Sequence, residues 1–113
     1  MKRFSLAGTL TGMHEDGNSF YIGELEGRAA GVLHLLRDGA TAGLYAATTV
    51  RSLRRRGVCS TLMARAIADA QAAGCDVICL SAAADGDPER LYGAIGFERV
   101  FESVLWTTPA KPA

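Results

Sequence analysis

The stretch AATTVRSLRRRGVCSTLM, residues 46–63, decides the fold of this chain of 113 residues. It begins with the β-branched run Thr48, Thr49 and Val50, which favours a strand. Three successive arginines and a glycine follow and indicate a turn. Apolar residues then recur at helical spacing from Val58 onward. The stretch therefore predicts a strand, an arginine-rich turn and a helix, in that order.

Residues 54–61, which we name the cradle, have the properties of an anion-binding site. The first N–H groups of a helix have no partner within it, and the helix dipole favours negative charge there. Gly57 lets the backbone approach a ligand closely, while Cys59, Ser60 and Thr61 leave the first helical turn uncrowded. The three arginines add positive charge suited to phosphate. We interpret the cradle as a binding site for a pyrophosphate group.

The residues before the cradle predict an antiparallel meander. Glu26–Gly27 and Asp38–Gly39 are expected hairpin turns, because these residue types tolerate positive φ. The strands that these turns would join cover residues 19–25, 29–36 and 44–50. Residues 1–18 are poorly defined by pattern: residues 4–10 allow a short strand, and residues 14–18 are typical of a turn.

The residues after the turn predict two helices and two strands. A helix over residues 58–73 should end at Gly74, and the apolar run 77–80 suits a strand buried on both faces. Asp87 is the expected cap of a second helix that begins at Pro88 and ends at Gly96. A last strand or strand pair is expected over residues 97–106, followed by a tail over residues 107–113. The order predicts one α/β domain over residues 1–113, a mixed sheet with an antiparallel meander followed by helix-strand-helix-strand.

The composition argues against several classes of protein. Twelve basic and twelve acidic side chains cancel, so no overall field attracts nucleic acid or a membrane surface. No apolar run approaches the ~20 residues of a membrane span, and the N-terminus does not resemble a signal peptide. Three cysteines without metal-ligand spacing indicate reduced thiols in a cytoplasm and no metal site.

Two motifs resemble those of the GNAT superfamily of acyl-CoA-dependent N-acetyltransferases. Arg54-x-x-Gly57-x-Cys59 is similar to the family's Gln/Arg-x-x-Gly-x-Gly/Ala signature, with cysteine in place of the last small residue. LYGAIGF, residues 91–97, is similar to the family's LYxxxGF segment. Together with Gly43-Leu44-Tyr45 before the turn, the resemblance covers roughly residues 19–106 in the family's order.

The resemblance implies a site for acetyl-CoA between the strands expected at residues 44–50 and 77–81. Backbone groups near Thr48 would hold the pantetheine arm and polarise the thioester carbonyl. Tyr92 matches the family tyrosine that protonates the departing CoA thiolate; its alternative role is a core ring with a bonded hydroxyl. The cofactor-binding residues expected on this basis are Thr48, Thr49, Val50, Arg54, Arg55, Arg56, Gly57, Val58, Cys59, Ser60 and Thr61.

Other residues have both a catalytic and a structural interpretation. His34 lies in an apolar strand, where a histidine is more often structural than a general base. Cys59 stands at a helix N-terminus, which can lower a thiol pKa, although direct acetyl transfer needs no thiol nucleophile. His14, Glu15 and Asp16 could in principle bind a metal, but a solvated turn explains them better.

Two functions of different classes remain. The first is an acetyl-CoA-dependent N-acetyltransferase that acts on an unidentified small-molecule or peptide amine. The second is a non-catalytic CoA-binding or assembly module without an acceptor pocket. Little precedes the meander, where the family has a first strand and two helices. We therefore expect either a C-terminal part of a longer chain or a homodimer in which residues 97–106 or the uncovered sheet face pair with a second copy.

Overall fold

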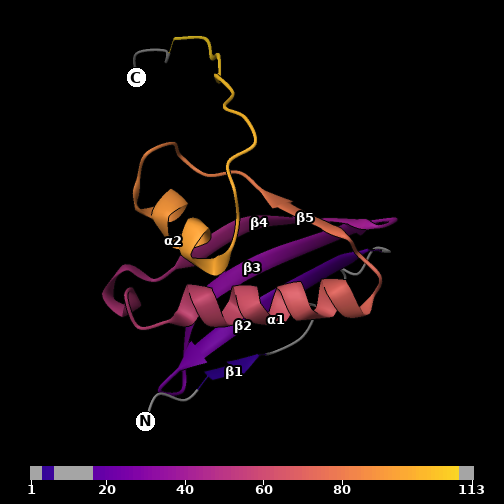
Figure 1. The fold of residues 1–113 in the computed structure, drawn as a ribbon. Coiled ribbons are helices and arrows are strands. Elements are labelled where there is room, and N and C mark those ends of the chain that lie inside the picture. The colour runs from indigo at the N-terminus through magenta and orange to yellow at the C-terminus, as the bar shows by residue number, and fades with distance from the viewer. Residues whose placement is uncertain (1–3, 7–16, 110–113) are drawn as a thin grey trace. The chain divides into compact units, whose positions relative to one another are not determined.

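The structure, a computed structural model, describes residues 4–6 and 17–109. Figure 1 shows the elements that these residues form. In chain order they are β1 (Phe4–Leu6), β2 (Asn18–Leu25), β3 (Arg28–Asp38), β4 (Thr41–Thr49), the short 3-10 helix η1 (Arg51–Leu53), α1 (Val58–Ala72), β5 (Val77–Leu80) and α2 (Asp87–Ile95). The chain divides into two compact units, Met1–Ser81 and Ala82–Ala113.

The first unit contains a mixed sheet with the strands in chain order, β1-β2-β3-β4-β5. The first four strands pair antiparallel, and β5 pairs parallel to β4 from Thr41–Val77 to Leu44–Leu80. α1 connects the two parallel strands. The observed sheet confirms the expected antiparallel meander followed by a helix and a parallel strand.

The two hairpin turns differ in how closely they follow the expectation. Glu26 and Gly27 both have positive φ, 54° and 78°, as a tight turn between β2 and β3 requires. In the second hairpin, β3 continues through Asp38, which pairs with Thr41, so the turn lies one residue later than expected, at residues 39–40.

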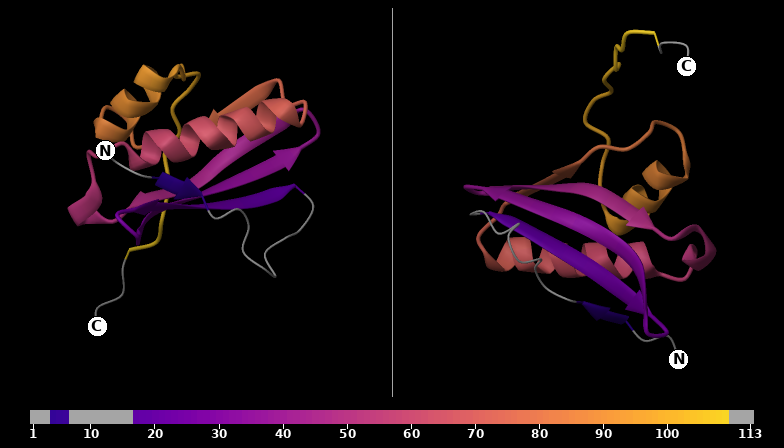
Figure 2. Two further views of the ribbon diagram at one scale, coloured as in Figure 1. Left: turned by 90° about the horizontal axis from the view of Figure 1, so that it is seen from below. Right: turned by 180° about the vertical axis from the view of Figure 1, so that it is seen from behind.

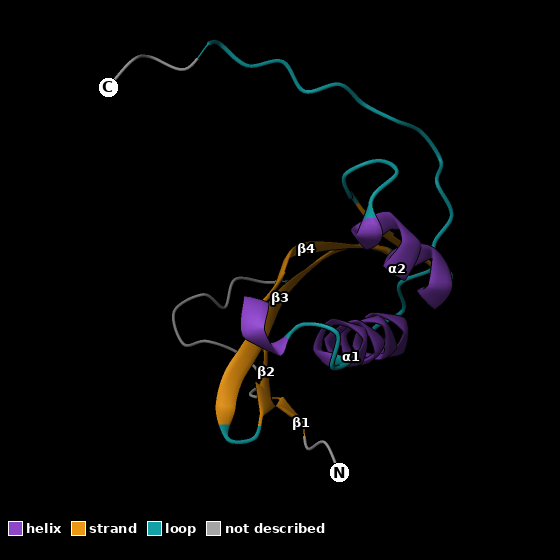
Figure 3. Cartoon of the chain, turned by 90° about the vertical axis from the view of Figure 1, so that its left-hand side faces the viewer, coloured by secondary structure: helices purple, strands orange, loops and turns teal. Residues whose placement is uncertain are grey.

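The core of the first unit lies between the sheet and α1. Figures 2 and 3 show α1 lying along one side of the curved sheet. The side chains that fill this layer alternate along the strands and recur at helical spacing along α1, as amphipathic elements require. They are Leu25, Leu33, Leu35 and Leu44 from the sheet and Val58, Leu62, Met63, Ala66 and Ala70 from the helix.

A pair of glycines allows the first turn of α1 to approach the sheet. Gly23 and Gly31 are paired across β2 and β3. A Cβ atom on Gly31 would lie 2.9 Å from both the Thr48 carbonyl oxygen and Val58 Cγ1, and one on Gly23 would lie 3.3 Å from Val58 and from Leu62. Val58 is 2% exposed. The first turn of α1 therefore packs directly against the backbone of these two glycines.

Further along α1, a polar contact ties the helix to β2. The Tyr21 hydroxyl donates to Asp69 Oδ2 at 2.6 Å, and Arg65 Nε donates to Asp69 Oδ1 at 3.2 Å. Burial, and then the hydrogen bond to Asp69, raise the pKa of Tyr21 above its usual value, so the phenol stays neutral. This contact fixes the position of α1 along the sheet.

The second unit contains α2, which runs from Asp87 as far as expected. Asp87 does not cap the helix: Gly86 is the capping residue, without a side-chain bond, and the Asp87 carboxylate pairs with Arg90. Asp87 is already helical, so its carboxylate can reach the next turn. Gly96, with φ of 125°, ends the helix as expected.

The expected strand over residues 97–106 is wrong. Residues 97–109 form no helix or strand, and Val100, Phe101, Val104, Leu105 and Trp106 are each at least 76% exposed. A strand needs a neighbour for its backbone N–H and C=O groups, and in the described parts of the chain no strand pairs with this segment.

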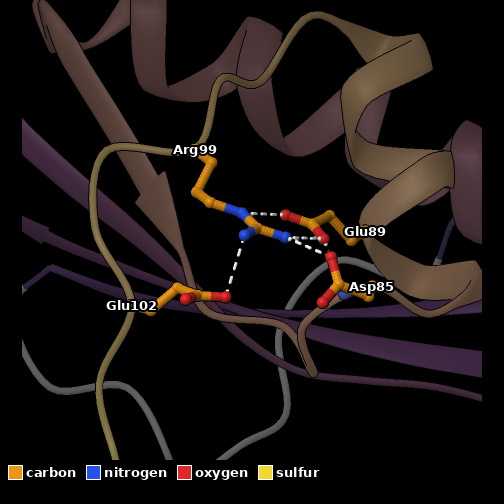
Figure 4. Close-up of polar contacts among 4 residues, drawn as sticks. All are labelled: Asp85, Glu89, Arg99 and Glu102. Atoms are coloured by element: carbon orange, nitrogen blue, oxygen red, sulfur yellow. Dashed lines mark hydrogen bonds and ion pairs between the residues drawn. The ribbon is translucent and has the colours of Figure 1, made fainter.

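The start of that segment is instead fixed by an arginine. Arg99 bonds Glu89 of α2, Asp85 of the preceding loop at 2.9 Å and Glu102 at 2.8 Å (Figure 4). The hydrogen bond from Arg99, and then the hydrogen bond from the Asp85 backbone N–H, lower the pKa of Glu89 to about 2. The cluster joins the loop before α2 and the first turn of α2 to the residues that follow the helix.

Several expectations concern the N-terminal residues. The short strand expected within residues 4–10 is present over Phe4–Leu6, whereas residues 7–10 and the group His14, Glu15 and Asp16 lie outside the described residues. In the part of the chain that the structure describes, no helix is long and apolar enough to cross a membrane. Among these same residues, no three His, Cys, Asp or Glu side chains are grouped so as to hold a metal ion.

Candidate functional site

The turn between β4 and α1 is held by backbone and side-chain bonds at its start. Val50 N–H donates to the Ala30 carbonyl at 2.8 Å, and Leu53 N–H donates to the Val50 carbonyl at 2.8 Å. Leu53 is buried and anchors η1. Arg54 Nε donates to the Thr49 carbonyl at 3.2 Å. The end of β4 and the start of the cradle are therefore one connected structure.

The backbone of the cradle suits an anion. Arg55 and Gly57 have positive φ, 62° and 83°, on either side of Arg56. Alternation of left-handed and other conformations turns successive N–H groups toward a common point. The α1 hydrogen-bond ladder begins where Thr61 N–H donates to the Gly57 carbonyl at 3.0 Å, so the N–H groups of residues 58–60 precede the ladder. These residues fit a phosphate-bearing ligand.

The three cradle arginines lie in different environments. Arg56 Nη2 forms an ion pair with Glu26 Oε1 of the β2–β3 turn at 2.7 Å. Arg54 is bonded to the Thr49 carbonyl, as described above. Arg55 is exposed and makes no hydrogen bond or ion pair with any residue that the structure describes. The sequence predicts positive charge at these three positions, and the structure distinguishes them by their partners.

The pairing of β4 with β5 ends five residues before the end of β4. The pairing of β3 with β4 shifts between His34–Tyr45 and Val32–Thr48, and Ala46 in the resulting bulge has φ of 56°. A bulge bends its strand and re-aims its edge. In the described residues, the pairing of β4 with β5 ends at Leu44. Beyond that point the second edge of β4 can accept an extended, amide-containing ligand.

Cys59 lies in the first turn of α1. Its thiol has a raised pKa, although a helix N-terminus by itself favours a lowered one. The side chain is half-buried, and this burial raises the pKa of the Cys59 thiol. The lowered pKa considered from the sequence is wrong because loss of solvation disfavours the thiolate. The raised pKa argues against an activated thiol nucleophile at Cys59, and its place in a cofactor site stays a prediction.

Tyr92 belongs to α2 in the second unit. Its ring packs edge-on against Phe97, with ring centroids 6.4 Å apart and planes at 72°. Its carbonyl accepts hydrogen bonds from the N–H groups of Gly96 and Phe97 at 3.1 and 3.0 Å. These contacts fix Tyr92 at the last turn of α2 and explain the structural part of the LYGAIGF motif. Proton donation by its hydroxyl stays a prediction.

His34 has a structural role in β3. Its Nε2 atom lies 2.6 Å from Asn18 Oδ1, and its ring stacks on Phe20 with centroids 4.4 Å apart. These contacts agree with the structural interpretation of this histidine. Sequence reasoning did not identify Asn18 as its partner or Glu26 as the partner of Arg56. Both pairs join residues far apart in the chain. The register of β2 and β3 brings Asn18 close to His34, whereas the Arg56–Glu26 pair forms only where the cradle lies beside the β2–β3 turn.

Comparison with known proteins gives one family. The acetyltransferase (GNAT) family matches residues 3–97 of this chain. No match is found among curated proteins.

Solved structures share the fold. A transcriptional regulator from Bacillus halodurans C-125 has a TM-score of 0.72 at 22% identity, over 83% of this chain and 68% of that chain. AAC(6')-Iy in complex with a bisubstrate analog, CoA-S-monomethyl-acetylneamine, has a TM-score of 0.72 at 18% identity, over 85% and 72% of the two chains. The aminoglycoside acetyltransferase meta-AAC0020 from an uncultured soil metagenomic sample has a TM-score of 0.71 at 15% identity, over 88% and 70%. At these identities the likeness concerns the fold alone.

Proposed function

Because this chain belongs to the acetyltransferase (GNAT) family, we propose that it transfers an acetyl group from acetyl-CoA to an amine. The observation that carries the proposal is the cradle, where Gly57 with φ of 83° leads into the unpaired first turn of α1. This geometry supports pyrophosphate binding by the N–H groups of residues 55–60. The cofactor is acetyl-CoA, and the reaction uses no metal.

Residues of β4 complete the proposed cofactor site. Thr48, Thr49 and Val50 follow the Ala46 bulge and lie beyond the last pair of β4 with β5, Leu44–Leu80. Their backbone groups bond the amides of the pantetheine arm in the manner of an added strand. A backbone N–H near Thr48 stabilises the negative charge that develops on the thioester oxygen. Val58, Cys59, Ser60 and Thr61 form the helical wall of the cradle.

The acetyl transfer itself requires little from the protein beyond positioning and proton transfer. Acetyl-CoA supplies an activated thioester. The amine forms the new C–N bond as the C–S bond breaks, so one proton leaves the amine and another must reach the departing thiolate. In the proposal, the Tyr92 hydroxyl donates the second proton.

The acceptor is an amine on a small molecule or a peptide. AAC(6')-Iy, which shares the fold, was solved with an analog that joins CoA to an acetylated neamine. This supports an amine acceptor as a class without naming one. The three free cysteines agree with a cytoplasmic location. We further propose a homodimer, because five large apolar side chains of residues 100–106 are exposed.

Release of free CoA from acetyl-CoA across a panel of amines tests this function. The panel should include aminoglycosides, polyamines and peptides with free N-termini. Amine-dependent release is the expected result. Tight binding of acetyl-CoA without release for any amine would favour the alternative, a CoA-binding or assembly module. Absence of binding would reject both.

A further inference from the structure

The three adjacent arginines of the cradle are unequal in the free protein, and this inequality indicates which of them is available for a ligand. Arg54 and Arg56 are each bonded to another part of the first unit, Arg54 to the Thr49 carbonyl and Arg56 to Glu26. Arg55 is exposed and has no polar partner within the described parts of the chain. We propose that Arg55 alone binds the 3′-phosphate of CoA, whereas Arg54 and Arg56 shape the cradle.

The bond between Arg56 and Glu26 connects two turns that are 30 residues apart in sequence. Glu26 has φ of 54° and is followed by Gly27 with φ of 78°, so the tight β2–β3 turn holds this glutamate at a fixed place beside the cradle. The pair is partly exposed, with 33% of the Arg56 side chain and 63% of the Glu26 side chain accessible. It therefore orients the backbone between the two positive-φ residues of the cradle more than it stabilises the whole fold.

Arg54 has a similar role on the other side of the turn. Its Nε–H bond to the Thr49 carbonyl at 3.2 Å joins the cradle to the last residue of β4. Arg54 and Arg56 thus tie the cradle to β4 and to the β2–β3 turn, while Arg55, with φ of 62°, is exposed and takes part in neither bond.

The chemistry of CoA matches this division of roles, and the inference rests on the proposed cofactor. The pyrophosphate can be held by N–H groups of the cradle and by the dipole of α1. The 3′-phosphate is a separate group on the ribose with a charge of about −1.5 to −2. It needs a cation of its own, and a guanidinium matches phosphate with two parallel hydrogen bonds. Arg55 is the cradle arginine whose whole guanidinium has no partner among the described residues, whereas Arg54 uses its Nε and Arg56 its Nη2 for bonds within the first unit.

Binding of CoA and of dephospho-CoA, which lacks only the 3′-phosphate, tests the proposal by calorimetry. The unaltered protein should bind CoA about 10- to 100-fold more tightly, the effect expected of one hydrogen-bonded charge pair. Arg55→Gln should weaken CoA binding by that factor and leave dephospho-CoA binding unchanged, so that the two affinities become equal.

Two further variants distinguish specific binding of the 3′-phosphate from effects that change the affinity for CoA and dephospho-CoA alike. Arg51→Gln, a matched control that removes an exposed arginine of η1 just before the cradle, should leave both affinities within twofold of the original values. Glu26→Gln should weaken both ligands by the same factor and keep their ratio, with little change in the melting temperature of the free protein. Rescue of both affinities in Glu26→Asp would support a positioning role over a loss of net charge.

The possible failures are distinguishable. If the unaltered protein binds neither ligand, the proposed function is rejected together with this inference. If it binds both equally, or if Arg55→Gln keeps the preference for CoA, only the role of Arg55 is rejected. Loss of the preference in Arg51→Gln or in Glu26→Gln would also overturn it, by assigning the 3′-phosphate to Arg51 or Arg56.

Discussion

Gly31→Ala tests whether the close packing of α1 against the glycine backbone of β3 is needed for the structure of the cradle. The added Cβ would lie 2.9 Å from the Thr48 carbonyl oxygen and 2.9 Å from Val58 Cγ1. The first of these neighbours is backbone of β4 and the second is the first residue of α1, so neither can rotate away freely. Overpacking of this kind costs about 1 to 3 kcal/mol. For a domain of this size, that corresponds to a fall of about 4 to 20 °C in melting temperature.

Gly31→Ala should also weaken acetyl-CoA binding, because the shift is imposed on Thr48 and Val58 at the two sides of the proposed site. Thermal unfolding with and without acetyl-CoA measures both effects. Gly93→Ala is the matched control: a Cβ at Gly93 would meet nothing within 4 Å, and alanine within α2 should stabilise by about 0.5 to 1 kcal/mol. An unchanged melting temperature and unchanged acetyl-CoA binding in Gly31→Ala would refute the argument.

Three other predictions concern Tyr92, Tyr21 and the exposed C-terminal segment. Tyr92→Phe should lower kcat by about 10² to 10⁴ with little change in acetyl-CoA affinity, as expected for loss of a general acid; full turnover would favour the structural role. Tyr21→Phe removes the donor to Asp69 and should cost about 1 kcal/mol in denaturant unfolding; an equal stability would show that α1 does not depend on this bond. Sedimentation at micromolar concentration should give a dimer, because residues 100–106 expose five large apolar side chains; a monomer free of aggregation would contradict it.

Much of the fold follows from local signals in the sequence. Residue-pair preferences located the β2–β3 turn, hydrophobic periodicity located α1, and a continuous apolar run located the short strand β5. These signals depend on neighbours within a few residues, so they persist in the folded chain. The expectation that β5 is buried on both faces is wrong, because Val77 and Cys79 are exposed. The start of α1 was predictable because Gly57 combines a turn conformation with a position directly before an apolar-periodic run.

The errors concern features that depend on distant partners. Residues 97–106 have the apolar content of a strand, but content alone does not supply the neighbour that a strand must bond. Asp87 has a residue type common at caps, yet Pro88 fits either of the first two helical positions, and the helix begins one residue earlier than expected. The pKa of Cys59 depends on burial of the thiol, which no local pattern reports.

The site was predictable in its location and not in its internal organisation. The sequence identified residues 54–56 as a source of positive charge. It could not show that Arg56 pairs with Glu26, since this contact exists only when β2 and β3 form their hairpin beside the turn. The bulge at Ala46 was also unexpected, because alanine carries no signal for a left-handed conformation.

The most direct measurement of the central claim is the acetyl-CoA-dependent melting temperature of the unaltered protein and of Gly57→Val. At 100 times its dissociation constant, a ligand of the folded state stabilises by about 2.7 kcal/mol, which is a shift of roughly 10 to 20 °C here. Gly57 has φ of 83°, so valine would displace the cradle backbone and should abolish the shift. Gly39→Val is the control, since Gly39 also has positive φ, 61°, with open space around it in the β3–β4 turn. We expect Gly39→Val to keep the acetyl-CoA-dependent shift in melting temperature and Gly57→Val to lose it. A shift in Gly57→Val as large as in the unaltered protein would contradict the assignment of the cradle as the acetyl-CoA site.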